Sequence, residues 1–148
     1  MKRSLLAALL LVAGAVTAAA EDRVVGRWVL DEPAFRAQVE RFYAAAITEV
    51  PAAERDQAEA FVERAVEATV ARMAGSTATF EPDGTVMLEP AEGRPQTGSW
   101  SREGDRIVLE PGVDADEAVR MVASFEDGHL KLTPDQENAV GFLMRRAE

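Results

Sequence analysis

Residues 76–90 read STATFEPDGTVMLEP, and this stretch decides the fold class. Apolar and polar residues alternate on both sides of Pro82-Asp83-Gly84, and a period of two is typical of β-strands with one buried face. Asp-Gly between two such runs is among the strongest signals of a tight hairpin, because the turn requires positive φ angles. The stretch therefore predicts two antiparallel strands joined by a short turn.

The same pattern recurs further along the chain. Residues 96–111 alternate around Glu103-Gly104-Asp105, residues 117–134 alternate around Asp127-Gly128, and residues 138–146 form a last apolar run. One earlier run, residues 24–30, brings the number of predicted strands to eight. Because no crossover helix separates the strands after residue 75, we expect an antiparallel, meandering sheet.

The alternation also assigns an apolar inner face to this sheet. Its predicted members are Ala78, Phe80, Val86, Leu88, Gly98, Trp100, Ile107, Leu109, Val119, Met121, Ala123, Phe125, Leu130, Leu132, Val140, Phe142 and Met144. The strand residues that alternate with these include Thr, Ser, Arg and Lys, and they form the predicted outer face. A long meander of this kind removes its exposed edges by curling, so we predict an eight-stranded up-and-down barrel or half-barrel.

Residues 32–74 interrupt the strands with a helical pattern. Asp31 is a suitable N-cap and Pro33 falls in the first turn, where its missing N–H costs nothing. Apolar residues then recur at spacings of three and four on both sides of Pro51, and Gly75 is a natural stop. The fold class is therefore α+β, with a two-helix hairpin between the first and second strands.

The first twenty residues have the pattern of an export signal. The basic pair Lys2-Arg3 precedes an apolar stretch at 5–16, and three alanines at 18–20 supply small side chains for cleavage. The apolar stretch is shorter than the roughly 20 residues that span a bilayer, so an uncleaved anchor is the less favoured alternative. We expect residues 1–20 to be a signal peptide and residues 21–148 a single, periplasmic or secreted domain.

The composition of the chain limits the kinds of molecule that we expect it to bind. The chain contains no cysteine, so we expect neither a lipid anchor of the lipoprotein type nor a disulfide framework. Without Lys2 and Arg3 the 16 basic residues fall to 14 against 26 acidic residues, a net charge of −12. Such a domain repels phosphate, so we expect no binding to nucleic acid and no stable membrane insertion after signal cleavage.

Gly26-x-Trp28, seven further meandering strands and arginines at the end of the last strand resemble the lipocalin and fatty-acid-binding-protein superfamily. The resemblance implies an up-and-down barrel that encloses a small apolar ligand. It also implies that Trp28 packs across the closed end of the barrel, beneath an arginine of the last strand. Arg146 continues the inward phase of Met144 and is the first choice for this cation–π contact, with Arg145 second. Gly26, Trp28 and Arg146 are therefore the expected barrel-closing residues.

The whole mature chain is similar to exported bacterial proteins of lipocalin-like type, for which no single activity is implied. The shared features are the first-strand motif, the amphipathic insert, the hairpin Phe80–Thr85 and the Thr-Gly-Ser-Trp strand at 97–100. The insert is similar to the helical lid of the fatty-acid-binding branch. Eight strands instead of ten, longer helices and the absence of the later lipocalin motifs are departures that affect the ligand cavity more than the fold.

Residues suited to catalysis are scarce. The single histidine, His129, follows a hairpin turn, where we expect it to be exposed and without a catalytic partner. Asp114, Asp116 and Glu117 form one acidic cluster, but calcium takes six to eight oxygen ligands, so a solvated turn is the favoured interpretation. We expect no enzyme activity, no metal and no cofactor.

The predicted function is the binding of a small neutral apolar molecule in the barrel, under the helices as a lid. The alternative is an envelope interaction or structural module whose helices fill the barrel and leave no room for a ligand; its protein partner is unknown. For the ligand-binding function we expect an open cavity beneath the helices. Its candidate ligand-binding residues are Phe42, Tyr43, Phe61, Phe80, Trp100, Met121, Phe125 and Phe142.

Overall fold

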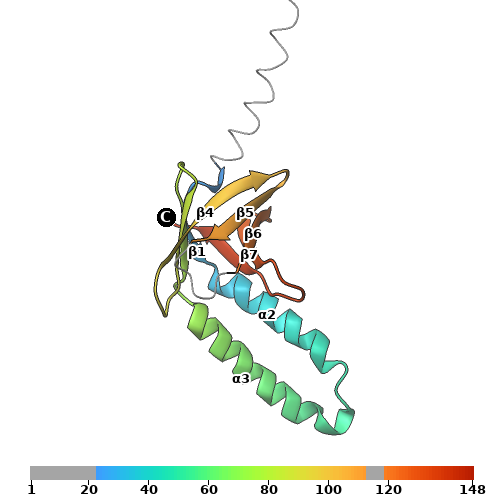
Figure 1. Ribbon diagram of the computed structural model, residues 1–148. Coiled ribbons are helices and arrows are strands. Elements are labelled where there is room, and N and C mark those ends of the chain that lie inside the picture. Colours follow the sequence, from blue (N-terminus) through green and yellow to red (C-terminus); the bar gives the residue numbers. More distant parts are fainter. Residues whose placement is uncertain (1–22, 113–118) are drawn as a thin grey trace, which may run out of the picture.

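The computed structural model describes residues 23–112 and 119–148, so the predicted signal peptide and the acidic cluster at 114–117 lie outside the described residues. Eight strands form a closed barrel in which each strand pairs antiparallel with the next and the last pairs with the first (Figure 1). The strands are β1 (Gly26–Leu30), β2 (Thr77–Phe80), β3 (Thr85–Glu89), β4 (Gln96–Glu103), β5 (Arg106–Pro111), β6 (Met121–Glu126), β7 (His129–Pro134) and β8 (Phe142–Arg146). The predicted fold class is confirmed, and the barrel is closed.

The first hairpin shows how turn chemistry sets the register. Gly84 has a φ of +90°, which favours glycine, and the Asp83 carboxylate accepts a 2.9 Å hydrogen bond from the Thr85 amide. The turn pairs Phe80 with Val86, so both side chains point inward and are buried. Because successive side chains alternate between faces, this register places one apolar set inside the barrel.

The barrel core consists of the predicted inward side chains together with the segment before β1. Its buried members are Val24, Trp28, Ala78, Phe80, Val86, Trp100, Ile107, Leu109, Ala123, Leu130, Leu132 and Met144. Two residues assigned to the inner face precede their strands. Val119 comes before β6, which begins at Met121, and is exposed, whereas Val140 comes before β8 and packs against the cluster at the hairpin base. The strand pattern could not locate the start of β6 because Val119 continues the alternation of β6 by two residues.

The inserted hairpin consists of α2 (Glu32–Ile47), a short 3-10 turn η1 (Ala52–Glu54) and α3 (Arg55–Met73). It projects from one end of the barrel, and only its base lies against the strands (Figure 1). The buried helical residues are Phe35, Val39, Val66 and Val70, which pack with Leu30 of β1. Phe142 of β8 is packed against both this cluster and the barrel core, so it joins the two.

The helices therefore differ from the expected lid or stopper. Among the described residues, the barrel core cluster contains no residue of α2 or α3, so this core is built by side chains from the strands and from the segment before β1. Within the described part of the chain, no helix has the length and hydrophobicity needed to cross a membrane.

Candidate functional site

The closed end of the barrel is formed by Trp28 and Arg146. The Arg146 guanidinium lies 4.6 Å from the centroid of the Trp28 ring, and the indole Nε1 donates a 2.8 Å hydrogen bond to the Val24 carbonyl. Arg146 also donates hydrogen bonds to the carbonyls of Val25, at 2.6 Å, and Arg23, at 2.7 Å. One side chain of the last strand thus holds the segment that precedes the first strand.

Gly26 makes this contact sterically possible. Its φ is +125°, and a Cβ atom at this position would lie 2.5 Å from Arg146 Nη1. Only glycine adopts this backbone conformation without strain and leaves space for the guanidinium. The structure therefore gives a physical reason for a glycine two residues before Trp28.

Three of the candidate ligand-binding residues fill the barrel core. The rings of Phe80 and Trp100 meet edge to face at 6.0 Å, and Phe125 lies 6.0 Å from the Trp28 ring. The Arg23 guanidinium lies over the Phe125 ring, 4.1 Å from its centroid. None of the three lines the cavity at the base of the hairpin.

The three candidate residues on the hairpin also lie apart from the barrel interior. Tyr43 packs against the cluster at the hairpin base, whereas Phe42 is 47% exposed and Phe61 is 65% exposed. None of these three side chains lines the cavity at the base of the hairpin, and the hairpin projects away from the barrel (Figure 1).

A cavity of about 310 Å³ does exist where the base of the hairpin meets the barrel. Its wall combines strand residues with the last residue of α3, and it includes two of the candidate residues, Met121 and Phe142. The lining residues are Leu30, Met73, Ser76, Thr77, Ala78, Leu88, Glu89, Pro90, Gln96, Met121, Leu132, Phe142 and Met144. The structure thus brings together two of the eight candidates.

The polar groups of this cavity gather near the ends of β2, β3 and β4. Ser76 is buried, and its hydroxyl oxygen accepts a 3.2 Å hydrogen bond from the Ala91 amide. Gln96 is in register with the inward-facing Leu88, so it belongs to the inner phase of β4. Among the described lining residues Glu89 is the single charged one, and its carboxylate accepts a 3.1 Å hydrogen bond from the Thr77 hydroxyl.

Sequence reasoning missed the contribution of Met73 and Leu30 to the cavity. Met73 is the last residue of α3, and Leu30 the last residue of β1, so both lie where the insert joins the barrel. The apolar stripe of the helix includes Met73, but this pattern does not indicate which part of the stripe meets a cavity. The sequence could have indicated Ser76 as an inward-facing residue, because it precedes Ala78 of β2 by two residues and so shares its phase.

His129 is not the exposed, unpartnered residue that the sequence predicts. It is half-buried, and its Nε2 lies 2.9 Å from the Asp31 carboxylate at the start of α2. Leu30 of β1 and Leu130 of β7 both pair with Met144, one from each side of β8, so Asp31 and His129 lie near each other on the two sides of this strand and their side chains meet across it. The hydrogen bond from His129 lowers the pKa of Asp31 below 3.8, and the hydrogen bond from the Ala34 amide acts in the same direction.

This pair forms a structural connection between β7 and α2. Asp31 accepts hydrogen bonds from the Ala34 amide and from the imidazole, so each of its two carboxylate oxygens has a partner. Among the described residues no group of three or more His, Asp or Glu side chains is placed to hold a metal ion.

Comparison with known proteins gives no relative from which a role could be transferred. No protein-family model matches the sequence, and no curated protein or solved structure shows significant similarity to it. The class defined by the fold is therefore a closed eight-stranded antiparallel barrel with a two-helix insert.

Proposed function

We propose that the chain is an exported, non-enzymatic, lipocalin-like domain that binds a small neutral apolar molecule in the cavity at the base of the hairpin. The observation that carries this proposal is the cavity itself. Its volume of about 310 Å³ falls at the lower end of the range of small-molecule sites, and its wall is mostly apolar with a few polar groups on one side.

The polarity of the wall favours a neutral ligand. No lysine or arginine is among the described residues that line the cavity, so a carboxylate would lose its hydration without gaining a cationic partner. Glu89 near the same wall would repel it further. The Ser76 hydroxyl and the Gln96 amide offer neutral hydrogen-bonding groups, which suit an apolar molecule with one alcohol, carbonyl or amide group.

In this proposal the helices form part of the cavity wall and do not act as a lid. Met73 supplies one wall of the cavity from the last turn of α3, next to Phe142 and Leu30. The hairpin base therefore completes the site, whereas the outer part of the hairpin has no role in ligand contact. Export places the domain in the periplasm or outside the cell, where carriage of a poorly soluble molecule is a suitable task.

The proposal is tested by native mass spectrometry of the mature protein, with organic extraction, and by titration with the neutral fluorescent probe N-phenylnaphthylamine. We expect Leu88→Trp to fill the cavity and to weaken probe binding at least about tenfold, because the larger ring occupies space that the probe needs. Met87→Trp is the matched control, since Met87 is the preceding residue of β3 and is exposed on the outer face.

Two results would contradict the proposal. One is a protein that carries no extractable molecule and fails to bind the probe. The other is equal weakening by the two tryptophan variants, which would place the probe outside the cavity.

A further inference from the structure

The outer part of the hairpin carries a groove that is separate from the barrel cavity. The groove lies between α2 and α3, and its volume is about 320 Å³. Ala44, Ile47 and Val62 supply apolar surface along it. The carboxylates are those of Glu40, Glu59, Glu63 and Glu67, all of which are exposed.

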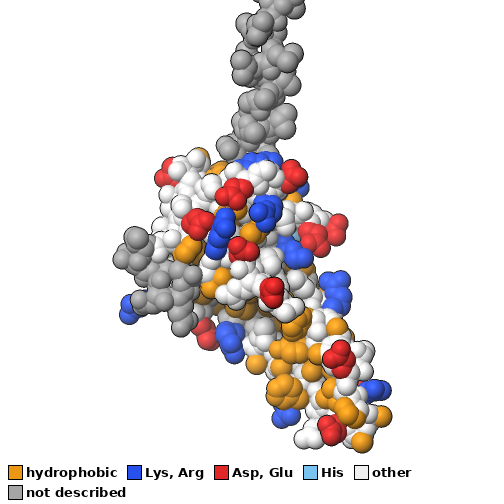
Figure 2. Space-filling model, turned by 45° about the vertical axis from the view of Figure 1, so that its right-hand side comes forward, with side chains coloured by type: hydrophobic (Ala, Val, Ile, Leu, Met, Phe, Trp, Pro, Cys, Tyr) orange, Lys and Arg blue, Asp and Glu red, His pale blue; other side chains and the backbone are white. Residues whose placement is uncertain are grey.

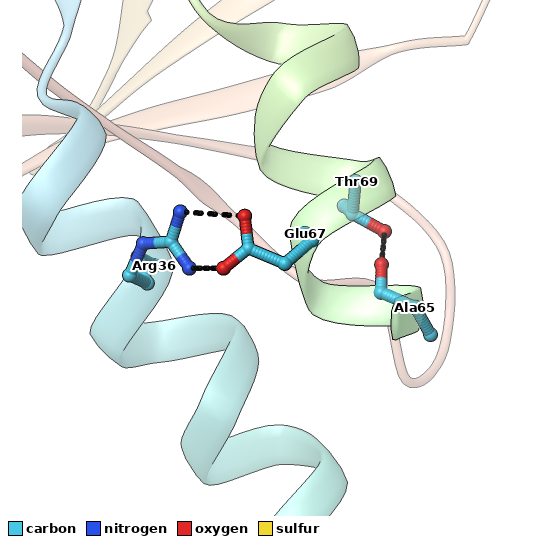
Figure 3. Close-up of polar contacts among 4 residues, drawn as sticks. All are labelled: Arg36, Ala65, Glu67 and Thr69. Atoms are coloured by element: carbon cyan, nitrogen blue, oxygen red, sulfur yellow. Dashed lines mark hydrogen bonds and ion pairs between the residues drawn. The ribbon is translucent and has the colours of Figure 1, made fainter. Parts of the chain in front are cut away.

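One ion pair crosses the groove at the end nearer the barrel. Arg36 of α2 and Glu67 of α3 face each other in a two-bonded arrangement, with N···O distances of 2.6 and 3.3 Å (Figure 3). Arg36 is the single cationic lining residue among those described, and this pair neutralises it. The remaining lining carboxylates have no described ion-pair partner within 4.0 Å, so the groove carries a net negative charge.

The hairpin around the groove lacks a core of its own. In α2 the buried residues end at Val39, and in α3 they begin at Val66, so no described side chain between these positions is buried. Hydrophobic side chains are visible at the surface of the hairpin, with acidic side chains among them, in the lower part of Figure 2. A polar-rimmed apolar surface of this kind is typical of a site that another molecule covers.

We propose that this groove binds a basic amphipathic helix of another protein. Leucine-like side chains on one face of such a helix would cover Ala44, Ile47 and Val62, and lysines or arginines flanking that face would pair with the glutamates. A third helix packed on a helical hairpin gives the outer turns the apolar contacts that they lack. This inference is independent of the ligand proposed for the barrel cavity.

The negative charge of the groove favours a basic partner helix over a second copy of the chain, nucleic acid or anionic lipid. A second copy docked groove to groove would bring the same glutamates together, and like charges in contact oppose association. Phosphates of nucleic acid or of anionic lipid would be repelled in the same way. From Arg36 to Ile47 the lining residues span eleven steps of α2, or about 16 Å, which corresponds to three turns of a partner helix.

The test uses the full mature protein and two model peptides of about 18 residues, long enough to form a helix on binding. One peptide carries leucines on one face and lysines on the other, and the second carries glutamates in place of the lysines. We expect the lysine peptide to bind, with affinity that falls as salt is raised, and the glutamate peptide not to bind. Binding is measured by titration calorimetry, and helix formation by circular dichroism.

Paired variants separate the groove from the general negative charge of the protein. We expect Glu59→Gln with Glu63→Gln to weaken binding of the lysine peptide about tenfold, because two exposed ion pairs are lost. Glu92→Gln with Glu137→Gln removes the same charge from two exposed barrel loops and is expected to leave binding unchanged within about twofold.

A second pair of variants tests the apolar contacts between the groove and the peptide. Ile47→Ser is expected to weaken binding, whereas Phe61→Ser is not, because Phe61 lies two residues before Glu63 and so faces away from it on α3. Equal effects of the groove and loop charge variants would overturn the proposal. So would a dimer that Ile47→Ser dissociates, since the occupant would then be a second copy.

Discussion

The closure of the barrel depends on a contact between two residues that lie at opposite ends of the described chain. Arg146 stacks on Trp28 and binds two carbonyls of the segment before β1, and Gly26 leaves the room for it. Hydrogen bonds from a charged donor contribute more than neutral ones, and the stacked indole adds a cation–π term. These side chains stabilise the pairing of β1 with β8, which is the pairing that closes the sheet.

We predict that Gly26→Ala destabilises the protein by about 2 kcal/mol, because the added methyl group displaces the guanidinium and strains the backbone. The measurement is a double-mutant cycle with Arg146→Ala, followed by urea denaturation. The part of the cost that comes from the clash with the guanidinium should disappear when Arg146 is already absent, whereas the backbone strain should remain. Costs that simply add would show that the glycine is required for its backbone angle alone.

At the scale of elements, Asp31 joins β1, α2 and β7. It caps α2 through the Ala34 amide, and its contact with His129 ties the helix to the first residue of β7. Because the pKa of Asp31 is lowered in the folded state, its contribution to stability is complete above the unfolded pKa. That contribution is lost as the pH falls through the folded pKa.

We therefore expect Asp31→Asn to lower the free energy of unfolding above about pH 5, and this effect should shrink as the pH falls below the unfolded pKa of about 4 and through the lower folded pKa. Asparagine can still cap the helix, so this variant isolates the charge. The measurement is chemical denaturation of both proteins across this pH range. Glu32→Gln removes the neighbouring carboxylate and is the control, and the same pH dependence in both variants would contradict the role of Asp31.

The elements themselves could be predicted from the sequence, but their packing could not. The period of two and the Asp-Gly turns located the strands, since both signals depend on neighbours in the chain. Asp31 and His129 meet across β8, because β1 and β7 both pair with this strand, and no local pattern encodes that pairing. The apolar stripes of α2 and α3 predicted amphipathic helices, but they did not show that only Phe35, Val39, Val66 and Val70 would be buried.

The cavity was difficult to predict for a related reason. Phe80, Trp100 and Phe125 have the same inward phase as Met121, yet the first three fill the core and the last lines the cavity. The difference depends on how far each residue lies from the hairpin base along a tilted strand. That distance follows from the closure of the barrel and not from alternation.

At the scale of the whole molecule, the barrel and the hairpin are two packing units that share a small junction. Leu30 and Ser76, which flank the insert, are joined by a 2.9 Å backbone hydrogen bond. The chain thus leaves the barrel and returns to it at one place. Removal of residues 32–74 would leave Leu30-Asp31-Gly75-Ser76, an Asp-Gly turn between two strands that are already paired.

We predict that this deletion leaves a folded barrel. The near-ultraviolet circular dichroism of Trp28 and Trp100 should persist, because their packing involves no helical residue. The free energy of unfolding should fall by about 2–4 kcal/mol, since Leu30 and Phe142 lose their helical cover. Loss of the near-ultraviolet signal would show that the barrel needs the hairpin base in order to form.

The Arg146 contact also keeps both ends of the described chain away from the hairpin. It brings the last strand against Arg23 and Val25, so the two ends of the described chain lie close together, whereas the hairpin begins at the far end of β1 (Figure 1). A protein coupled to a surface through either end would therefore hold its helices outward, toward the surrounding medium. In that orientation the tip of the hairpin is the first part that an approaching molecule meets.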